Sequence, residues 1–229
     1  MNIYLDLDGS LLDVSDRYYK IYSDLMKAFG IQPVSKAEYW RAKRSGREET
    51  LLKKAKVPLA NYYDKRMHML ELISYLKLDK KSNGVERMLS QLETDNHRTI
   101  LVTLRKSKSN LHRQLQHLEL QSLFNIILQR RDEEFEPWRA KASLISHDVD
   151  FDKKQSVMVG DTETDILAAK HLGIISVAVS SGLRMKTMLL VFRPDYIITR
   201  ITDLPPVIQD INSHQIPPEN FIVSRPSVG

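Results

Sequence analysis

The chain has 229 residues, of which 42% are hydrophobic and 28% are charged, and its formal net charge is +5. This balance is ordinary for a globular protein, and no apolar run reaches the ~20 residues that cross a bilayer, which excludes a membrane-spanning helix. The chain contains no cysteine, so disulfides, zinc–thiolate sites and cysteine nucleophiles are excluded as well. The missing cysteines and the lack of a signal-peptide pattern at the N-terminus predict a cytoplasmic location.

The first predicted element is a buried strand at residues 3–7 that ends in two carboxylates. Asp6 and Asp8 lie at its C-terminal end, and Gly9 follows and permits a tight turn. Residues two apart in a strand point to the same side, so both carboxylates can address one site. An EF-hand calcium loop is excluded, because its glycine is the sixth loop residue and Gly9 is the fourth counted from Asp6. A surface loop with two incidental aspartates is the remaining alternative.

Residues 14–81 form a basic, helical insertion. They hold 16 Lys and Arg against 8 Asp and Glu, whereas the rest of the chain holds 18 against 21. Apolar residues recur at helical spacing in SDRYYKIYSDLMKAFG, AEYWRAKRSGREETLLKKAK and NYYDKRMHMLELISYL, and no strand pattern interrupts them. We therefore predict an all-helical domain at 14–81. Its positive charge indicates either a solvated helical face or a surface that attracts an anion.

After the insertion, predicted strands alternate with predicted helices. Strands rich in Val and Ile that alternate with helices indicate an α/β fold, a Rossmann-like parallel sheet with helices on both faces. We predict a core formed by residues 1–13 and 82–210 and an extended C-terminal tail at 211–229. The predicted strands are 99–104, 125–128, 156–160, 175–179 and 195–199, and the predicted helices are 85–94, 108–120 and 163–173.

The strand predicted at 156–160 also ends in carboxylates, Asp161 directly after it and Asp165 in the first turn of the next helix. Helix capping and the helix dipole explain each residue singly, but they do not explain why two strand ends each carry an Asp pair. If the strands are neighbours, four carboxylates converge, and two charges ~4 Å apart repel by about 4 kcal/mol at an effective dielectric of 20. Such an all-oxygen cluster needs raised pKa values or a hard cation, for which Mg²⁺ is the best match.

These motifs resemble those of the haloacid dehalogenase (HAD) superfamily. YLDLDGSLLD is similar to its first motif and VMVGDTETD to its fourth. The second motif, a Ser or Thr after the next strand, matches Thr103 in ILVTLR, and the third, a Lys at the start of a later helix, matches Lys141 in EPWRAKASLI. The resemblance covers about residues 1–210. The insertion lies where the helical-cap subgroup, which includes phosphoglycolate phosphatase and β-phosphoglucomutase, carries its cap.

The resemblance implies an enzyme, a Mg²⁺-dependent phosphatase that works through an aspartyl-phosphate. Asp6 would be the nucleophile, and Asp8 the general acid and base that separates phosphoryl transfer from dehalogenation. The metal would be held by Asp6, by Asp8 through its backbone carbonyl and by Asp161, with Asp165 close by or bound through water.

The resemblance also implies residues that bind the phosphoryl group. Thr103 would contact its oxygens, and Lys141 would balance the charge on the nucleophile and the phosphoryl group. Arg139 competes with Lys141 for this role, because the usual Lys-Pro pair of the third motif is missing. Arg105, which follows Thr103 by two residues, is either a further phosphate ligand or a solvated side chain.

Substrate choice is assigned to the basic stretch RAKRSGREE of the insertion, where Arg44 and Arg47 flank Gly46. These arginines would read a second anionic group of a small phosphorylated metabolite, or they belong to an ordinary basic helix end. Two other functions stay open: a phosphomutase of the β-phosphoglucomutase type, and a non-enzymatic protein that binds nucleic acid or another anion on a HAD scaffold. No nucleic-acid-binding motif supports the second. The physiological substrate and the oligomeric state, monomer or homodimer, are not determined by the sequence.

Overall fold

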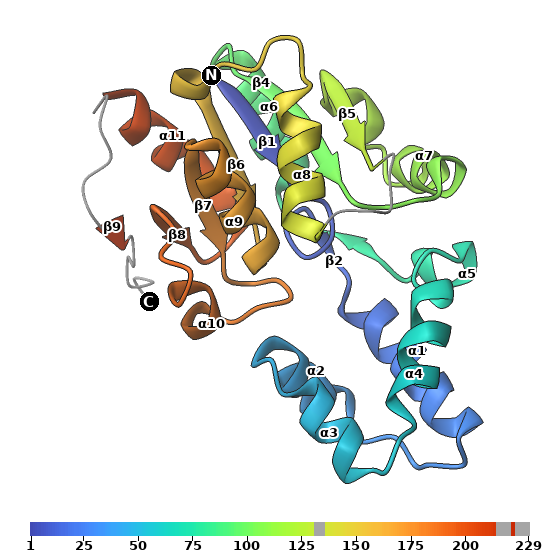
Figure 1. The fold of residues 1–229 in the computed structure, drawn as a ribbon. Coiled ribbons are helices and arrows are strands. Elements are labelled where there is room, and N and C mark those ends of the chain that lie inside the picture. Colours follow the sequence, from blue (N-terminus) through green and yellow to red (C-terminus); the bar gives the residue numbers. More distant parts are fainter. Residues whose placement is uncertain (131–135, 214–220, 223–229) are drawn as a thin grey trace, which may run out of the picture.

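The computed structural model describes residues 1–130, 136–213 and 221–222. At the centre of these residues lies a parallel sheet of seven strands in the order β5-β4-β1-β6-β7-β8-β9 (Figure 1). The strands are β1 (Asn2–Leu5), β4 (Arg98–Thr103), β5 (Ile126–Gln129), β6 (Ser156–Gly160), β7 (Ile175–Val179), β8 (Tyr196–Ile198) and β9 (Phe221–Ile222). The predicted α/β class with a parallel sheet is confirmed.

The central strand β1 pairs with β4 on one side and with β6 on the other. Leu5 at its C-terminal end lies opposite Leu101 of β4 and Val159 of β6. The two strands that end in carboxylates are therefore direct neighbours. All three C-terminal ends meet at one edge of the sheet, where ligands bind in open α/β folds.

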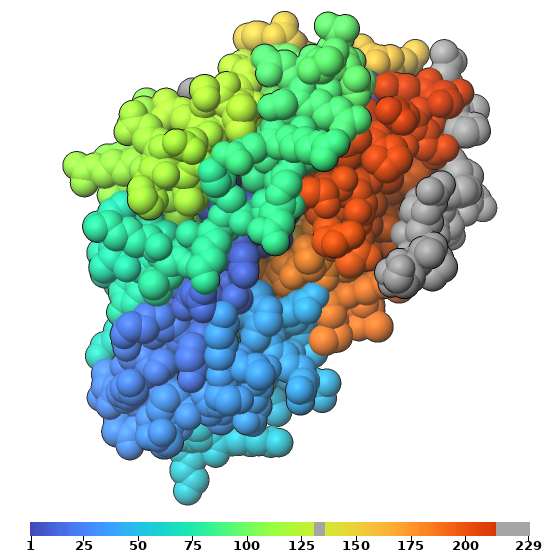
Figure 2. All heavy atoms as spheres, turned by 180° about the vertical axis from the view of Figure 1, so that it is seen from behind, coloured from blue at the N-terminus to red at the C-terminus, as the bar shows by residue number. Residues whose placement is uncertain are grey.

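Helices cover both faces of the sheet because alternate strand residues point to opposite sides. Ile3 and Leu5 pack in one apolar cluster with α6, α7 and α11, whereas Tyr4 packs in another with α8 and α9. Figure 2 shows α6 and α11 lying against each other on the rear face. The helices of the core are α6 (Val85–Thr94), α7 (Lys108–His117), α8 (Pro137–Ser146), α9 (Glu163–Leu172), α10 (Lys186–Leu190) and α11 (Leu204–Ser213), with 3-10 turns at Gln121–Leu123, Lys153–Gln155 and Ile201–Asp203.

The insertion folds into helices around an apolar cluster of its own, below the sheet in Figure 1. Tyr22 and Tyr39 stack at the centre of this cluster with ring centroids 4.3 Å apart. The helices are α1 (Ser15–Ala28), α2 (Lys36–Arg44), α3 (Glu48–Lys54), α4 (Leu59–Met69) and α5 (Ile73–Leu76). The end of the insertion differs from the prediction, because β3 (Lys80–Lys81) pairs antiparallel with β2 (Leu12–Asp13) where the chain returns to the core.

Several predicted strand limits are off by one or two residues, and two helix boundaries differ as well. Helix α7 ends at His117, and Glu119 adopts a left-handed backbone with φ 54°. Helix α11 runs past residue 210 to Ser213, because Ile211 continues the buried stripe of Val207 and Ile208. Most of the predicted tail, 214–220 and 223–229, lies outside the described residues. Within the described part of the chain, no helix is both long enough and apolar enough to cross a membrane.

Candidate active site

Three buried carboxylates meet at the C-terminal edge of β1 and β6. Asp6 follows β1, Asp161 follows β6, and Asp165 lies in the first turn of α9. One oxygen from each lies within 4.8 Å of the others. Asp6 lies two residues after Tyr4 and so continues the sheet face that α8 and α9 cover. The neighbouring strands thus bring together three of the four predicted carboxylates.

Lys141 is the cation that this cluster contacts. It lies on the second turn of α8, where its Nζ donates to Asp6 Oδ1 at 2.6 Å and to Asp165 Oδ1 at 2.5 Å. Its side chain is 3% exposed. Arg139 points elsewhere: its side chain is 59% exposed, and its Nε lies 3.8 Å from Glu136. The geometry therefore places Lys141, and not Arg139, beside the predicted nucleophile.

Asp161 is held by two loops that approach it very closely. Its Oδ2 accepts from the Leu183 backbone N–H at 2.5 Å, and its Oδ1 accepts from the Ser10 hydroxyl at 3.3 Å. Gly9 and Gly182 lie against the same carboxylate, and a Cβ at either position would collide with it. Gly9 also has φ 94°, a backbone conformation that residues other than glycine rarely adopt. These glycines are required because the backbone itself encloses Asp161.

Asp165 both caps a helix and belongs to the site. Its Oδ2 accepts from the Thr162 backbone N–H at 3.0 Å and from the Thr162 hydroxyl at 2.8 Å, which forms a capping box at the start of α9. Its other oxygen faces Lys141. Capping and clustering are therefore not alternatives for this residue, since each uses one oxygen.

Three ionised carboxylates in this cluster would carry more negative charge than Lys141 balances. Burial raises the pKa of Asp6 to about 7 although Lys141 opposes the shift, and burial with the charges of Asp6 and Asp165 raises the pKa of Asp161 well above its usual range. The two carboxylates hold the pKa of Lys141 above its ordinary value in spite of its burial. The atoms that these three carboxylates offer to a metal ion are all oxygens, so these residues fit a hard divalent cation.

Asp8 does not join this cluster through its carboxylate. The chain turns at Leu7, whose carbonyl accepts from the N–H groups of Leu11 and Leu12, and the Asp8 side chain leaves the direction of the strand. Asp8 Oδ1 accepts from Arg17 Nη2 at 2.7 Å and from Arg105 Nη2 at 2.6 Å, and Oδ2 accepts from Arg105 Nε at 2.7 Å. Of the four carboxylates expected to converge, three therefore do so, and the Asp8 side chain does not.

Arg17 and Arg105 share a second buried carboxylate, Asp79. Arg17 Nε lies 3.1 Å and Arg105 Nη2 lies 3.5 Å from Asp79, and the Gln114 amide donates to the same carboxylate at 2.7 Å. Burial would raise the pKa of Asp8, but the arginines outweigh it and hold that pKa below the usual range. Burial raises the pKa of Asp79 to about 6. Two carboxylates and two guanidiniums thus form one network where the insertion joins the core.

Thr103 ends β4 beside this network. Its side chain is buried, and its Oγ1 accepts from the Arg105 backbone N–H at 3.3 Å, so the hydroxyl proton is not used in that contact. Two of the Arg105 nitrogens contact Asp8, while Nη1 is buried and has no hydrogen-bond partner in the described structure. If Arg105 also binds phosphate, Nη1 is the atom left for it.

The predicted specificity arginines lie at the contact between the insertion and the loop after β7. Arg44 Nη2 donates to the Ser180 carbonyl, and the Arg44 carbonyl accepts from the Met185 N–H at 3.1 Å. Arg47 is exposed, and its Nε donates to Ser45 Oγ at 3.2 Å. Arg44 therefore holds the two parts together, and Arg47 points to solvent.

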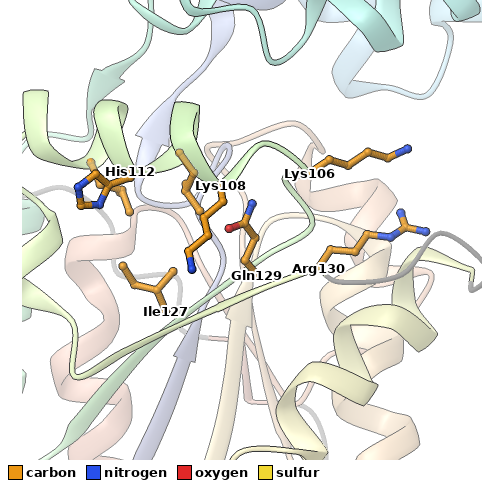
Figure 3. Close-up of a pocket in the computed structure, with 8 residues that line it drawn as sticks. Lys106, Lys108, His112, Ile127, Gln129 and Arg130 are labelled. Carbon is orange, nitrogen blue, oxygen red and sulfur yellow. The ribbon is translucent and has the colours of Figure 1, made fainter.

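Two cavities flank this edge of the sheet, and none of the three clustered carboxylates lines either of them. The first, of about 200 Å³, lies between Trp40 of α2 and the loops around Gly9 and Gly182. The second, of about 290 Å³, lies between α7 and β5; Figure 3 shows Lys108 directed toward Ile127.

Sequence reasoning missed Arg17 and Asp79, and it did not pair Arg105 with Asp8. Arg17 could have been found, because it precedes Ile21 and Leu25 by one and two turns and so occupies a buried position on the apolar stripe of α1. An arginine there requires a buried anion. Asp79 gave no comparable signal, since it follows α5 in an irregular segment.

Comparisons with known proteins agree with this geometry. Residues 3–179 match the family model described as haloacid dehalogenase-like hydrolase. A phosphoglycolate phosphatase from Synechococcus elongatus is 26% identical over 207 residues, which cover 88% of this chain and 94% of that protein. The pyrophosphatase PpaX from Bacillus mycoides is 26% identical over 141 residues, which are 59% of this chain and span 63% of the length of PpaX.

The fold has close counterparts among solved structures. A hydrolase of the haloacid dehalogenase-like family from Streptococcus pneumoniae superposes with a TM-score of 0.71 over 91% of this chain and 98% of that one. Its sequence identity is 20%, so this structural similarity shows only that the two proteins share a fold. The family match itself spans most of the sheet together with the Asp6, Thr103, Lys141 and Asp161 positions, and the chain belongs to the haloacid dehalogenase-like hydrolase family.

Proposed function

We propose that this protein is a Mg²⁺-dependent phosphatase that hydrolyses a small phosphorylated metabolite through an aspartyl-phosphate on Asp6. The observation that carries the proposal is the buried cluster in which Lys141 contacts Asp6 and Asp165 beside Asp161. The similarity to a phosphoglycolate phosphatase over 88% of the chain supports a phosphate monoester as substrate.

Asp6 is the proposed nucleophile. One of its oxygens attacks phosphorus, the bond between phosphorus and the ester oxygen breaks, and the phosphoryl group is transferred to Asp6. Lys141, 2.6 Å from Asp6, offsets the charge of the carboxylate and of the incoming dianion. Water then attacks the aspartyl-phosphate, and phosphate leaves with the regeneration of Asp6.

Asp8 is the proposed general acid and base. It donates a proton to the leaving oxygen in the first step and takes a proton from the attacking water in the second. In the described arrangement its carboxylate is engaged by Arg17 and Arg105. Because Arg17 belongs to α1, a movement of the insertion would change these contacts and with them the freedom of Asp8 to reach the substrate.

The Mg²⁺ ion would be held by Asp6, Asp161 and the Asp8 backbone carbonyl, with Asp165 close by or bound through water. When bound, it would neutralise the carboxylates and the phosphoryl oxygens. Thr103 through its hydroxyl and Arg105 through Nη1 would bind phosphoryl oxygens. We further propose that residues 1–13 and 82–210 form the catalytic core and 14–81 the cap, with Arg44 and Arg47 at the cap's edge, and that the protein is cytoplasmic.

The test is hydrolysis of a panel of phosphoglycolate, sugar phosphates, nucleotides and pyrophosphate with Mg²⁺. We expect turnover of at least one phosphate ester, its loss in EDTA and its return with Mg²⁺. Asp6→Asn should abolish turnover, whereas Asp64→Asn, a change of a 76% exposed aspartate on α4, should not. Retained activity in Asp6→Asn would refute the nucleophile assignment. Release of inorganic phosphate, and not of an isomeric sugar phosphate, separates the phosphatase from the phosphomutase.

A further inference from the structure

Three cations of the insertion surround the ring of Tyr18. The Arg17 guanidinium carbon lies 5.4 Å, Lys43 Nζ lies 5.3 Å and the Arg66 guanidinium carbon lies 5.2 Å from the ring centroid. Cations at this distance are attracted to an aromatic ring, but three positive charges on one ring also repel one another. Their positions therefore need anions nearby.

Tyr18 lies where the insertion meets the core. It packs against the apolar clusters of both parts. Trp40 stands edge-on to it with ring centroids 6.4 Å apart, and Trp40 also lines the cavity of about 200 Å³ that reaches Gly9 and Gly182. The two glycines adjoin the Asp161 carboxylate. The cations around Tyr18 thus lie across this junction from the carboxylate cluster.

Two of the three cations are already matched by carboxylates. Arg17 contacts Asp8 at 2.7 Å and Asp79 at 3.1 Å. Lys43 contacts Glu48 at 2.7 Å. The third cation, Arg66 near the end of α4, has no such pair.

Arg66 is half-buried, and its guanidinium has no hydrogen-bond or ion-pair partner among the described residues. Glu48 is the carboxylate whose charge acts on it most strongly. The oxygens of Glu48 are already used, by Lys43 Nζ at 2.7 Å and by the hydroxyls of Tyr39 at 2.9 Å and Tyr62 at 3.5 Å. The guanidinium of Arg66 therefore has donors that no described residue uses.

Arg44 and Arg47, the two arginines favoured from the sequence, are not both buried and unpaired in this way. Arg44 binds the Ser180 carbonyl, and Arg47 is exposed beside Ser45. Arg66 instead contacts the ring of Tyr18, as does Arg17, and Arg17 also donates to the carboxylate of Asp8. The path from Asp8 through Arg17 and Tyr18 to Arg66 runs from the proposed acid into the insertion.

We propose that Arg66 is a specificity-determining residue that binds a second anionic group, a carboxylate or a phosphate, on the leaving part of the substrate. The proposal rests on the proposed phosphatase function and narrows its substrate to phosphate esters whose leaving group is itself an anion. A guanidinium binds such a group through charge-assisted, often bidentate hydrogen bonds. The ring of Tyr18, 5.2 Å from the Arg66 guanidinium carbon, helps to hold Arg66 in place.

Binding of unreactive phosphonates tests this without turnover. Titration calorimetry with Mg²⁺ present would compare phosphonoacetate and methylenebisphosphonate, which carry a second anion, with propylphosphonate, which does not. The wild-type protein should bind at least one of the first two about 10- to 100-fold more tightly than propylphosphonate, the range expected for a charged hydrogen-bonded pair. Which of the two gains more identifies the anion as carboxylate or phosphate.

Arg66→Met should reduce this preference to about onefold, and Arg66→Lys should restore part of it. Lys65→Met is the matched control, because Lys65 is the neighbouring residue on α4 and lies 5.4 Å from the ring of Phe29 on an exposed face. It should leave the preference unchanged. Equal preferences in wild type and Arg66→Met, or no preference in the wild type, would overturn the proposal.

Kinetics separate this proposal from the function on which it rests. If the wild type turns over p-nitrophenyl phosphate, the phosphatase function stands; Arg66→Met should then raise KM for phosphoglycolate or pyrophosphate with little change for p-nitrophenyl phosphate. Equal changes in KM for all substrates would remove Arg66 from substrate reading while the function remains. A binding preference that depends on Arg66 in a protein without turnover would support the anion site and refute the phosphatase function.

Discussion

Lys141 stands between two carboxylates that would otherwise repel each other. Its Nζ reaches Asp6 and Asp165 within 2.6 Å, and its side chain is almost fully buried. Removing one partner of a buried ion pair leaves the other charges without compensation. The stability of the metal-free protein therefore depends on this single side chain.

We predict that Lys141→Met lowers the free energy of unfolding by about 3 kcal/mol in metal-free buffer. Arg139→Met is the control on the same helix, because its side chain is 59% exposed, and it should change stability by less than about 0.5 kcal/mol. Urea unfolding followed by circular dichroism measures both. A Lys141→Met protein as stable as Arg139→Met would mean that the cluster is not balanced by Lys141.

At this scale the sequence located the cluster but not its surroundings. Asp6, Asp161 and Asp165 come together as predicted, because each is tied to the end of a strand or the start of a helix whose position the periodicity sets. The partners of Asp8 could not be predicted in the same way. Arg105 is close in the sequence to Thr103, but its contact with Asp8 depends on the turn at Leu7 and on tertiary packing.

Asp148 connects three elements on the N-terminal side of the sheet. It follows α8, and its carboxylate accepts from the Tyr4 hydroxyl of β1 at 2.9 Å and from Arg98 of β4 at 2.6 and 2.9 Å. The hydrogen bonds from Arg98 are the largest cause that holds the pKa of Asp148 below its ordinary value of 3.8. The ionised form is thus favoured by folding.

The sign of the pH dependence follows from this shift. A carboxylate with a lowered folded-state pKa contributes stability above its unfolded pKa, and the contribution is lost as the pH falls through the folded-state pKa. Asp148→Asn should cost about 1–3 kcal/mol at pH 7, and its deficit should shrink as the pH drops below 3.8.

Urea unfolding at pH 7, 4 and 3 would measure this deficit. Asp150→Asn is the matched control, because Asp150 is 64% exposed and lies 3.3 Å from the same Arg98. It should cost less than about 1 kcal/mol at every pH. A deficit of Asp148→Asn that stays constant from pH 7 to pH 3 would contradict the assignment.

The two ends of the insertion are joined by an ion pair as well as by paired strands. Arg17 lies in the first turn of α1, and Asp79 immediately precedes β3. Their side chains are at most 1% exposed and 3.1 Å apart. The network thereby links the start of the insertion to its end, and both to Asp8.

A double-mutant cycle with Arg17→Met and Asp79→Asn should give a coupling energy of about 1–3 kcal/mol, because the pair is buried. The pair Lys20–Asp24 on α1, 2.6 Å apart with side chains 55% and 27% exposed, is the control and should give about 0.3–0.5 kcal/mol. Chemical unfolding of the single and double variants measures both cycles. Equal coupling in the two pairs would show that burial adds nothing to the network.

Among the elements, long periodic segments were predicted best. The strands at 156–160 and 175–179 and the helix at 85–94 have the predicted limits, since each has a strong apolar pattern. Helix α10 is five residues long and was not predicted, because so short a segment shows little periodicity. The strand pair β2–β3 was also missed, since two residues a strand give no alternating pattern.

For the molecule as a whole, a divalent cation should act as a stabilising ligand. An ion that binds only the folded state raises stability by about 2.7 kcal/mol at 100 times its Kd. We predict that Mg²⁺ raises the melting temperature relative to EDTA and that Asp161→Asn removes the increase. Asp64→Asn, an exposed change, should keep it. An unchanged melting temperature of the wild-type protein at millimolar Mg²⁺ would contradict a metal site at these carboxylates.

The pairing of β2 with β3 places the entry and the exit of the insertion side by side, with Leu12 opposite Lys81 and Asp13 opposite Lys80. Neighbouring strands are ~4.8 Å apart, so the insertion leaves the core and returns to it at nearly the same point, like a closed loop. Doubling the length of such a loop costs only about 0.6 kcal/mol. A different helical domain could therefore be grafted at this neck with little change to the strands. Arg17 is the residue such a graft must retain, because it alone of the insertion's described side chains holds Asp8.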